Sequence, residues 1–549
     1  GAPTRPGRGA VRVSAPVAFS GAGRSRHAYC GMPAGEPSAL PTPPDPDAPD
    51  PVPVTPPTGP LPAWLAYALV FGTSAAVLVL EITSLRLIAP YVGITLETNT
   101  AVIGLALAAI AFGAWSGGAA ADRLPPRSMI GPLLLVGGAF VLLVTPAIRL
   151  ATSAAGPGDA APIALLVATL TVFVPAAVLS AVPPMVVKLV LSSLTETGSV
   201  VGRLSGISTL GAILATFVTG FVLVAVVATS VILTGTGVLL VIAGLVLVAV
   251  NRRRGVPPHV GVTAPLVLAV VAGLGGLLVP SPCQVETRYH CASVVADPAR
   301  PDGRTLMLDT LRHSYVEPSD PTYLEFAYMT AFAAALDTRP PGPLSVLHVG
   351  GGGMTLPRYL LATRPDSTNR VVEIDPGVVE VDRTRLALPD DARLQVQVAD
   401  GRTAVRQLGT DSYDVYVGDA FGGVAVPWHL TTRETFLDVD RVLRADGLAV
   451  LNVIDYRPLD FARAELATVA SVFEHVALLT TAGGLNGGNL VILASHAPLD
   501  RGAVTAALAV KGGAMALVSE PAMRDFLGAD PLFLTDDHAP VDQLLTASR

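Results

Sequence analysis

The sequence predicts a multi-pass α-helical membrane domain followed by a water-soluble α/β domain, and three observations support this order. Hydrophobic residues make up 51% of the 549 residues and charged residues only 14%. The mean hydropathy is +0.56. Such an apolar composition excludes a simple cytosolic enzyme, a coiled coil, and disorder over most of the chain. Charge is also uneven: 14 basic and 9 acidic residues precede residue 281, against 22 and 34 from there on. The acidic second half disfavours nucleic acid as a partner, because phosphate contacts need a basic face.

Residues 1–62 are predicted to form a disordered, Pro-rich tail. The run PTPPDPDAPDPVPVTPPTGP at 41–60 has no apolar period and favours an extended, polyproline-like conformation. No signal peptide is visible, because the early arginines are not followed by an apolar core.

Residues 63–280 are predicted to form the transmembrane domain, with about seven helices. Each apolar run approaches the length that crosses ~30 Å of hydrocarbon. The fourth run contains Pro175, Pro183 and Pro184, so we expect it to be kinked. The seventh is the weakest, because Pro265 and four glycines interrupt it. The expected spans are about 63–88, 100–120, 129–148, 161–187, 204–227, 230–250 and 261–280.

The loops predict the orientation in a cell membrane through the excess of Arg and Lys on the cytoplasmic side. One side carries most of these residues, and the other has only Arg86 and Arg149, both near span ends. The N-terminus is therefore expected in the cytoplasm. Seven crossings would place the C-terminal domain outside the cytoplasm, whereas six crossings and a re-entrant seventh segment would keep it inside. The basic side comprises Arg5, Arg8, Arg12, Arg24, Arg26, Arg123, Arg127, Lys188, Arg203, Arg252, Arg253 and Arg254.

The soluble half is predicted to contain a small β subdomain with a linking helix at 281–335 and an α/β domain at 336–549. In the second part, short β-rich runs alternate with helical stretches, a pattern typical of a parallel sheet with helices on both faces. Two further strands at 475–481 and 489–495 would bring the sheet to about seven strands. The other strand runs are 345–349, 370–374, 394–398, 413–417 and 448–453.

The densest chemical signal is VLHVGGGGMT at 346–355, where a predicted strand leads into four glycines and then a helix. Glycine lets the backbone approach a ligand closely, and the N-terminus of a helix offers free N–H groups. About twenty residues later, VVEID ends the next strand with Glu373 and Asp375. An acidic residue at that place can accept hydrogen bonds from a ribose diol.

Two further strands end in acidic residues. VADGR ends the third strand with Asp400 and Gly401, and YDVYVGDAFGG ends the fourth with Asp419. All these groups are expected at the carboxyl edge of the sheet, where open α/β sheets bind ligands. The ordered set predicts an adenosine-type ligand; the alternative is an inert domain of similar fold.

The soluble half resembles the spermidine synthase (polyamine aminopropyltransferase) family. The matching segments in the membrane half resemble bacterial synthases fused to a transporter-like membrane module. The resemblance implies a Rossmann-like, methyltransferase-type domain and covers nearly all residues after 62. The segments that carry it are VETRYHCASVV (285–295), LMLDTLRHSYVEP (306–318), LEFAYM (324–329), the glycine loop, VVEID, VADGR, YDVYVGDAFGG and PWHLTTRETF (427–436), with LVLEITSLRLIAPYVG (78–93), GLALAAIAFGAWSGGAAADR (104–123) and GISTLGAILATFVTGFVL (206–223) in the membrane half.

This resemblance implies transfer of an aminopropyl group from decarboxylated S-adenosylmethionine, a co-substrate, to putrescine or a related amine, with release of methylthioadenosine. It implies polyamine biosynthesis without a permanently bound cofactor, and a homodimer. Asp419 matches the catalytic aspartate. Glu373 would hold the ribose, Asp400 and Gly401 the adenine, and Gly350, Gly351 and Gly352 would line the aminopropyl and sulfur region. The donor site would include His290, and the amine site Tyr328, Gly353 and Pro427.

The sequence departs from the family at several of these positions. The glycine loop of the family carries an amine-binding aspartate where this chain has Gly353, and the glutamine of the family is His290 here. Trp428 and His429 follow Pro427 where the amine channel is expected; a packed lid is the simpler interpretation of these side chains. Two alternatives therefore stay open: S-adenosylmethionine-dependent methyl transfer, and a sensor or transporter whose soluble domain binds polyamine or nucleoside without turnover.

Cysteine spacing bears on the location of the domain. Cys283 and Cys291 flank a predicted strand and could form a disulfide if the chain bends back, which would suit an extracytoplasmic location; two free thiols are the alternative. No Cys/His cluster has the spacing of a metal site. Within the first span, Glu81 and Arg86 are candidates for a functional role or for a pair that fixes helix packing.

Overall fold

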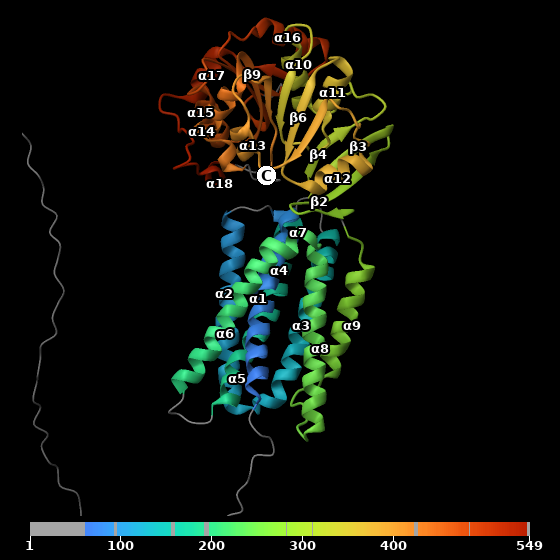
Figure 1. Ribbon diagram of the computed structural model, residues 1–549, viewed down its shortest axis with the longest axis vertical. Helices are drawn as coiled ribbons and strands as arrows, with labels where there is room; N and C mark the ends of the chain where they lie inside the picture. Colours follow the sequence, from blue (N-terminus) through green and yellow to red (C-terminus); the bar gives the residue numbers. More distant parts are fainter. Residues whose placement is uncertain are drawn as a thin grey trace, which may run out of the picture. The chain divides into compact units, whose positions relative to one another are not determined.

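The structure is a computed structural model that describes residues 61–92, 96–154, 160–191, 197–281, 283–309, 311–421, 427–481 and 484–545. The predicted tail at 1–62 lies outside the described residues apart from its last two. The described chain begins with a helical bundle and continues into strands and helices that alternate (Figure 1).

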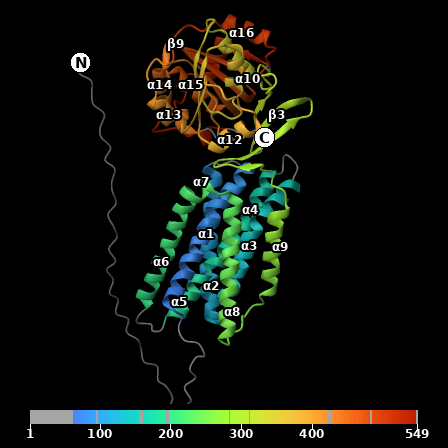
Figure 2. The same cartoon turned by 45° about the vertical axis from the view of Figure 1, so that its right-hand side comes forward.

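The helical bundle contains six segments that are long and apolar enough to cross a membrane, counted among the described residues: Ala63–Ile88, Asn99–Arg123, Pro126–Ala151, Thr169–Val190, Thr197–Val226 and Thr229–Arg253. Its helices are α1 (Ala63–Val92), α2 (Leu96–Arg123), α3 (Pro126–Ala154), α4 (Ala160–Ser180), α5 (Val182–Val190), α6 (Thr197–Phe217), the π-helical turn η2 (Val218–Leu223), α7 (Val224–Val226), α8 (Thr229–Arg253) and α9 (Thr263–Leu278) (Figure 2).

The fourth span is interrupted at Ala181, between α4 and α5. Pro183 and Pro184 follow the interruption directly, and proline cannot donate the hydrogen bond that continues a helix. Ala181 keeps helical dihedral angles, with φ of −75° and ψ of −17°, and α4 and α5 belong to one span, so the prolines interrupt the hydrogen bonds of this span where the sequence predicts a kink.

The seventh segment, α9, has 16 residues, fewer than the ~20 that a straight crossing needs. Its flanking residues nevertheless extend along α3. The amide of His259 donates to the carbonyl of Ser128 at 3.3 Å, and Arg149 Nη1 lies 3.5 and 3.4 Å from the carbonyl oxygens of Gly276 and Val279. Residues 259–279 thus cover the same stretch of the bundle as residues 128–149 of α3.

Helices α3 and α8 approach closely at paired glycines. A Cβ atom at Gly138 would lie 2.8 Å from the carbonyl oxygen of Gly237, and one at Gly244 would lie 2.9 Å from that of Gly131. Such distances leave no room for any side chain, which is the arrangement that brings membrane helices into backbone contact. We call these four residues the glycine seam.

The first strands after the bundle form a separate four-stranded antiparallel sheet in the order β1-β2-β3-β4. It occupies the range in which the sequence predicts a small β subdomain, and α10 follows it. A disulfide joins Cys283 to Cys291, with 4.9 Å between their Cα atoms, so the predicted pairing is present. The elements are β1 (Val285–Glu286), β2 (Cys291–Asp297), β3 (Arg300–Leu308), β4 (Leu311–Val316) and α10 (Ala327–Asp337).

The main sheet has eight strands among the described residues, in the order β12-β10-β11-β9-β8-β5-β6-β7. Strands β9, β8, β5, β6 and β7 are parallel neighbours, whereas β11, β10 and β12 pair antiparallel. The sequence predicts about seven strands; the additional strand is β12, whose three residues are too short for a recognisable pattern. The bounds are β5 (Ser345–Val349), α11 (Thr355–Thr363), β6 (Thr368–Glu373), α12 (Pro376–Arg385), β7 (Leu394–Val398), α13 (Gly401–Gln407), β8 (Tyr413–Gly418), η3 (Trp428–Leu430), α14 (Arg433–Val442), β9 (Leu443–Tyr456), α15 (Asp460–Ala470), β10 (His475–Thr481), β11 (Gly487–Ser495), α16 (Arg501–Val510), β12 (Met515–Leu517), α17 (Glu520–Leu527) and α18 (Val541–Leu544).

Helices cover both faces of this sheet, and alternate residues of the central strand β9 pack on opposite sides. Leu451 and Val453 belong to the core that includes Phe436 and Phe461, whereas Val450 belongs to the core around α10. A strand buried on both faces has little freedom to tilt or slide. The loops at the carboxyl ends of the strands are therefore held on a rigid frame.

Candidate active site

The site is built around the point where β5 and β8 lie side by side and the chain leaves the sheet in opposite directions. Gly350 follows β5 and Asp419 follows β8. The amide of Asp419 donates to the carbonyl of Val349 at 2.9 Å, which ties the two strand ends together. Gly350 has φ of 101°, and a Cβ atom there would lie 2.1 Å from the carbonyl oxygen of Asp419. This close approach explains why the position is glycine.

The carboxyl group of Asp419 is held by two donors. Asn452 Nδ2 donates to Oδ1 at 2.8 Å, and the Tyr328 hydroxyl donates to Oδ2 at 3.2 Å. Asn489 Nδ2 in turn donates to Asn452 Oδ1 at 2.9 Å. Burial raises the pKa of Asp419 to about 6, and the two hydrogen bonds oppose the increase. Asp419 keeps some accessible surface, so this oriented carboxylate can exchange a proton near neutral pH.

Tyr328 lies at the start of α10, with its ring edge-on to Phe332 at a centroid distance of 5.5 Å. Burial raises its pKa well above the ordinary value, and the negative charge of Asp419 adds to this effect. The phenol therefore stays protonated and acts as a hydrogen-bond donor to Asp419.

The glycine loop is bonded to Glu373 at the end of β6. The amide of Gly351 donates to Glu373 Oε2 at 2.8 Å, and the amide of Asp375 donates to Oε1 at 2.9 Å. Burial raises the pKa of Glu373 despite these bonds. A Cβ atom at Gly352 would lie 2.4 Å from the ring of His313, so this side of the loop has no room for a side chain.

Gly353 occupies the position at which the resemblance leads us to expect an aspartate. Its φ is 74°, and a Cβ atom there would lie 2.1 Å from Ser314 Oγ. Its amide donates to Asp382 Oδ1 at 2.9 Å, and its carbonyl accepts from Arg358 Nε at 3.1 Å. Both polar backbone groups are thus occupied, and an aspartate would displace Ser314.

His290 lies in the turn between β1 and β2. Its Nδ1 is 3.0 Å from Asp309 Oδ2, and Asp309 Oδ1 accepts from the amide of Cys291 at 2.9 Å. Burial opposes protonation, but the hydrogen bond and charge of Asp309 outweigh it and raise the pKa of His290, with smaller effects from Asp375 and Glu373. The charge of Glu373 therefore also acts on His290, as the smallest of these effects.

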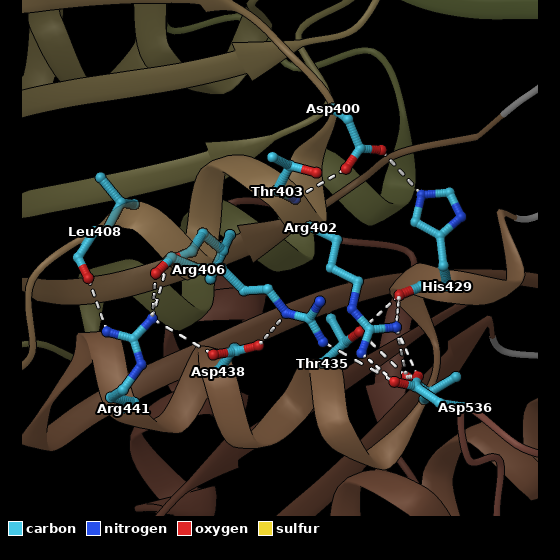
Figure 3. Close-up of polar contacts among 12 residues, drawn as sticks. Asp400, Arg402, Thr403, Arg406, Leu408, His429, Thr435, Asp438, Arg441 and Asp536 are labelled. Carbon is cyan, nitrogen blue, oxygen red and sulfur yellow. Dashed lines mark hydrogen bonds and ion pairs between the residues drawn. The ribbon is translucent and has the colours of Figure 1, made fainter.

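Asp400 caps the N-terminus of α13, where its Oδ1 accepts from the amide of Thr403 at 2.8 Å. Its Oδ2 lies 3.0 Å from His429 Nε2 (Figure 3). Burial alone would raise its pKa, but the bonds from Thr403 and His429 lower the pKa of Asp400 below its ordinary value. A Cβ atom at Gly401 would lie 2.5 Å from Val349. Asp400 is thus ionised and has both oxygens occupied, so an adenine amine would have to share Oδ2 with His429.

The position of His429 is fixed by hydrogen bonds to its carbonyl, and one of the donors, Arg402, is bonded to Asp536 near the C-terminus. The His429 carbonyl accepts from Thr435 Oγ1 at 2.6 Å and from Arg402 Nη1 at 3.2 Å. Arg402 also forms two bonds of 2.6 Å with the carboxylate of Asp536 (Figure 3). The same turn begins at Pro427, whose carbonyl accepts from the amide of Leu430 at 2.8 Å. Residues 422–426, directly before Pro427, lie outside the described residues.

The predicted strand-end residues therefore meet at one edge of the sheet, with Tyr328 against Asp419 and His290 near Glu373. Pro427 lies on the separate turn that carries His429. Sequence analysis missed Asn452, His313 and Asp309. Asn452 could have been found, because it is a polar residue inside the apolar run LAVLNVID. In the part of the chain that the structure describes, no group of three or more His, Cys, Asp or Glu residues could hold a metal ion.

Comparison with known proteins finds similarity within the second half of the chain. Residues 325–479 match the spermine/spermidine synthase domain. A polyamine aminopropyltransferase of Vibrio vulnificus is 30% identical over 162 residues, which cover 29% of this chain and 52% of the relative. An eEF1A lysine and N-terminal methyltransferase of Xenopus laevis is 32% identical over 150 residues, or 25% of this chain and 22% of the relative.

The chain spans about half the length of the aminopropyltransferase relatives that it matches. Among solved structures, it is similar to a probable spermidine synthase of Corynebacterium glutamicum, with 28% identity, a TM-score of 0.43, and coverage of 47% of this chain and 97% of the other. The sequence similarity thus supports a transferase of the spermidine synthase type that follows six long apolar helices.

Proposed function

We propose that the protein is an aminopropyltransferase that moves the aminopropyl group of decarboxylated S-adenosylmethionine to putrescine or a related amine and releases methylthioadenosine. The observation that carries this proposal is Asp419, whose carboxylate is fixed by Tyr328 and Asn452 beside the glycine loop. The domain match over residues 325–479 supports the same chemistry.

In this reaction the nitrogen of the acceptor amine attacks the methylene carbon that is bonded to the sulfonium sulfur. A carbon–nitrogen bond forms, the carbon–sulfur bond breaks, and its electron pair stays on sulfur as the thioether of methylthioadenosine. The sulfonium is already a good leaving group, so the enzyme mainly has to position the reactants and supply a neutral amine. Asp419 accepts the proton that the nitrogen loses, which its pKa of about 6 permits at neutral pH.

The remaining residues would bind the donor. Glu373 would accept hydrogen bonds from the ribose, and Asp400 with Gly401 would contact the adenine. Gly350, Gly351 and Gly352 would line the aminopropyl and sulfur region, with His290 beside the donor. Tyr328, Gly353 and Pro427 would border the amine. Because Gly353 supplies no carboxylate, we expect weaker binding of a dication than in synthases that carry the aspartate.

The test is an assay of the detergent-purified full chain with decarboxylated S-adenosylmethionine and putrescine, in which mass spectrometry follows methylthioadenosine and spermidine. We expect both products from the wild type and none above background from Asp419→Asn. Binding of the nucleoside without turnover of any of a panel of amines would contradict the proposal and favour a sensor.

Methyl transfer from S-adenosylmethionine is the second candidate, because one group of relatives carries the name of a lysine and N-terminal methyltransferase. The two donors differ by a carboxylate on the chain attached to sulfur. A competition experiment that measures binding of both donors to the purified chain separates the candidates, since an aminopropyltransferase prefers the donor that lacks the carboxylate.

We also propose that the soluble domain faces the extracytoplasmic side of the cell membrane. Residues 259–279 run along α3 from the level of Ser128 to that of Arg149, which favours a seventh crossing. The basic residues around Arg252 would then be cytoplasmic, and the Cys283–Cys291 disulfide suits an oxidising compartment. In this arrangement, substrates made in the cytoplasm have to cross the membrane.

A further inference from the structure

A cavity of about 300 Å³ lies between helices α1, α2, α4, α5 and α6. Five hydroxyl-bearing residues line it, and each lies toward the middle of its apolar span rather than near an end. Hydroxyl groups at such depth are far from water, and here they add polar groups to a cavity whose walls are otherwise apolar. The five residues are Thr73, Ser74, Ser180, Ser208 and Thr209.

The hydroxyls are only partly used to join helices. Ser74 Oγ and Ser208 Oγ are 2.5 Å apart and link α1 to α6, and Thr73 donates back to the carbonyl of Leu69 at 2.8 Å. Helix packing explains these bonds. The hydroxyls of Ser180 and Thr209 line the cavity without a protein partner among the described residues.

The interruption between α4 and α5 adds backbone acceptors to the same cavity. Pro183 and Pro184 line it and lack the N–H groups that would bond to the carbonyls of Leu179 and Ser180 in a continuous helix. Both residues with unused carbonyls also line the cavity. The carbonyl end of α4, which carries partial negative charge, therefore meets a start of α5 that offers few donors.

The polar groups around the cavity are suited to a cation, because hydroxyl and carbonyl oxygens can accept its hydrogen bonds. No charged side chain, basic or acidic, lines the cavity itself. Glu81 lies one helical turn beyond Leu78 and two beyond Ser74, on the same face of α1. Broken helices with exposed carbonyls near the middle of the membrane are a recurring way to bind cations in membrane proteins.

We propose that this cavity is a binding site for an organic ammonium ion, with the hydroxyls of Ser180 and Thr209 and the carbonyls of Leu179 and Ser180 as its acceptors and Glu81 as the neighbouring counter-charge. An alkylamine fits the class, since its N–H groups need several oxygen acceptors and its methylene groups suit the apolar walls. The choice of an alkylamine rests on the proposed function. If the soluble domain lies outside the cytoplasm, an amine made in the cytoplasm has to cross the membrane to reach it. A binding site for the amine inside the bundle would lie on that path.

The test measures equilibrium binding of radiolabelled putrescine to the full chain in lipid nanodiscs, in an Asp419→Asn background that removes turnover. Besides any binding at the amine site near Asp419, we expect a saturable component whose affinity falls tenfold or more in Glu81→Gln, a loss of about 1.4 kcal/mol. Pro184→Ala should weaken binding as well, because its new N–H group would bond to the Ser180 carbonyl. That variant adds a helical hydrogen bond, so it is not expected to unfold.

Thr216→Val is the matched control, because Thr216 is an exposed hydroxyl residue on α6 that donates to the carbonyl of Ala212 at 2.9 Å. Its affinity should equal that of the Asp419→Asn parent. Equal affinity in the parent, Glu81→Gln and Pro184→Ala would overturn the inference. Putrescine turnover without Glu81-dependent binding would reject this site alone, whereas Glu81-dependent binding without turnover would reject the proposed enzyme alone.

Discussion

Asp419 is an ionisable residue in a mostly buried position. Proton transfer needs its carboxylate to be charged, whereas burial disfavours the charged form. A carboxylate with a pKa of about 6 in the folded protein is destabilising above that pH, because the unfolded chain ionises it more readily. The hydrogen bonds from Tyr328 and Asn452 offset part of the cost. Activity and stability should therefore respond in opposite directions when this residue is neutralised.

The first prediction follows from this conflict. Asp419→Asn should abolish aminopropyl transfer and raise the free energy of unfolding of the α/β domain at pH 8 by about 2 kcal/mol, after allowance for partial exposure. The gain should shrink as pH falls through 6 toward 4, because protonation of the wild-type carboxyl removes its cost. Thermal unfolding at several pH values measures the difference. A variant that is less stable at pH 8 would show that the carboxylate stabilises the fold.

The pH dependence of the reaction gives a second prediction at this scale. Because Asp419 must be deprotonated to accept a proton, kcat/KM for the amine should rise as pH increases through about 6. Tyr328→Phe removes a bond that favours the charged form, so it should shift this limb to higher pH. Initial rates between pH 5 and 8 measure both effects. If the rise of kcat/KM near pH 6 stays at the same pH in Tyr328→Phe, the titrating group is not Asp419.

Some residues of the site were predictable and others were not, for physical reasons. The strand-end residues follow from local patterns, because a strand, a turn and a helix each leave a signature in the sequence. The exclusion of a side chain at Gly353 depends on Ser314, which is brought there by a different sheet. The bond from Arg402 to Asp536 joins residues 134 positions apart, and no local pattern encodes it.

At the level of elements, the turn η3 depends on the C-terminal segment through Arg402. This arginine bonds to the His429 carbonyl and to Asp536, and His429 contacts Asp400. Arg402 is therefore a positioning residue for the donor site. The planar guanidinium makes two parallel bonds that lysine cannot reproduce.

The third prediction tests this role. Arg402→Lys should raise KM for the adenosyl donor about tenfold and change kcat less than twofold, because the chemistry at Asp419 is untouched. Arg406→Lys is the matched control, since Arg406 also approaches Asp536, at 3.9 Å, but is half exposed. Steady-state kinetics for both variants measure KM for the adenosyl donor and kcat separately. Equal KM values in wild type and Arg402→Lys would remove Arg402 from the donor site.

The fourth prediction concerns the hairpin of β1 and β2. Strand β1 has only two residues, and the disulfide holds this hairpin together with the bonds of Gln284 to Ala292 and Val294. Cys283→Ser should lower the free energy of unfolding by about 2–3 kcal/mol, the value that chain entropy gives for a short closed loop. Thermal unfolding with and without reductant measures it, and Cys30→Ser is the control. Unchanged melting in Cys283→Ser would mean that the hairpin is held by other contacts.

At the scale of the whole molecule, length and composition identify six helices among the described residues that could cross a membrane. The position of residues 259–279 along α3 favours seven crossings. The sequence could not decide this, because the glycines and Pro265 weaken the apolar signal and the contact with α3 is a tertiary feature. The interruption between α4 and α5, by contrast, was predictable from Pro183 and Pro184.

The fifth prediction is the topology itself. Alkaline phosphatase, which is active only outside the cytoplasm, should be inactive when fused after Gly255 and active when fused after residue 545. A fluorescent protein that folds only in the cytoplasm should give the reverse pattern. Activity of phosphatase at neither site would place the domain in the cytoplasm and make α9 a re-entrant segment.

The glycine seam between α3 and α8 has a mechanical consequence. Helices α3 and α8 are in backbone contact at two places along their length. They cannot slide or tilt against each other without a clash, so they move as one rigid body. Helices α1 and α6 meet just as closely, because a Cβ atom at Gly211 of α6 would lie 2.5 Å from the carbonyl oxygen of Phe71 in α1. A movement of the bundle would therefore carry each of these helix pairs as a unit, and the two helices of a pair would not slide past each other.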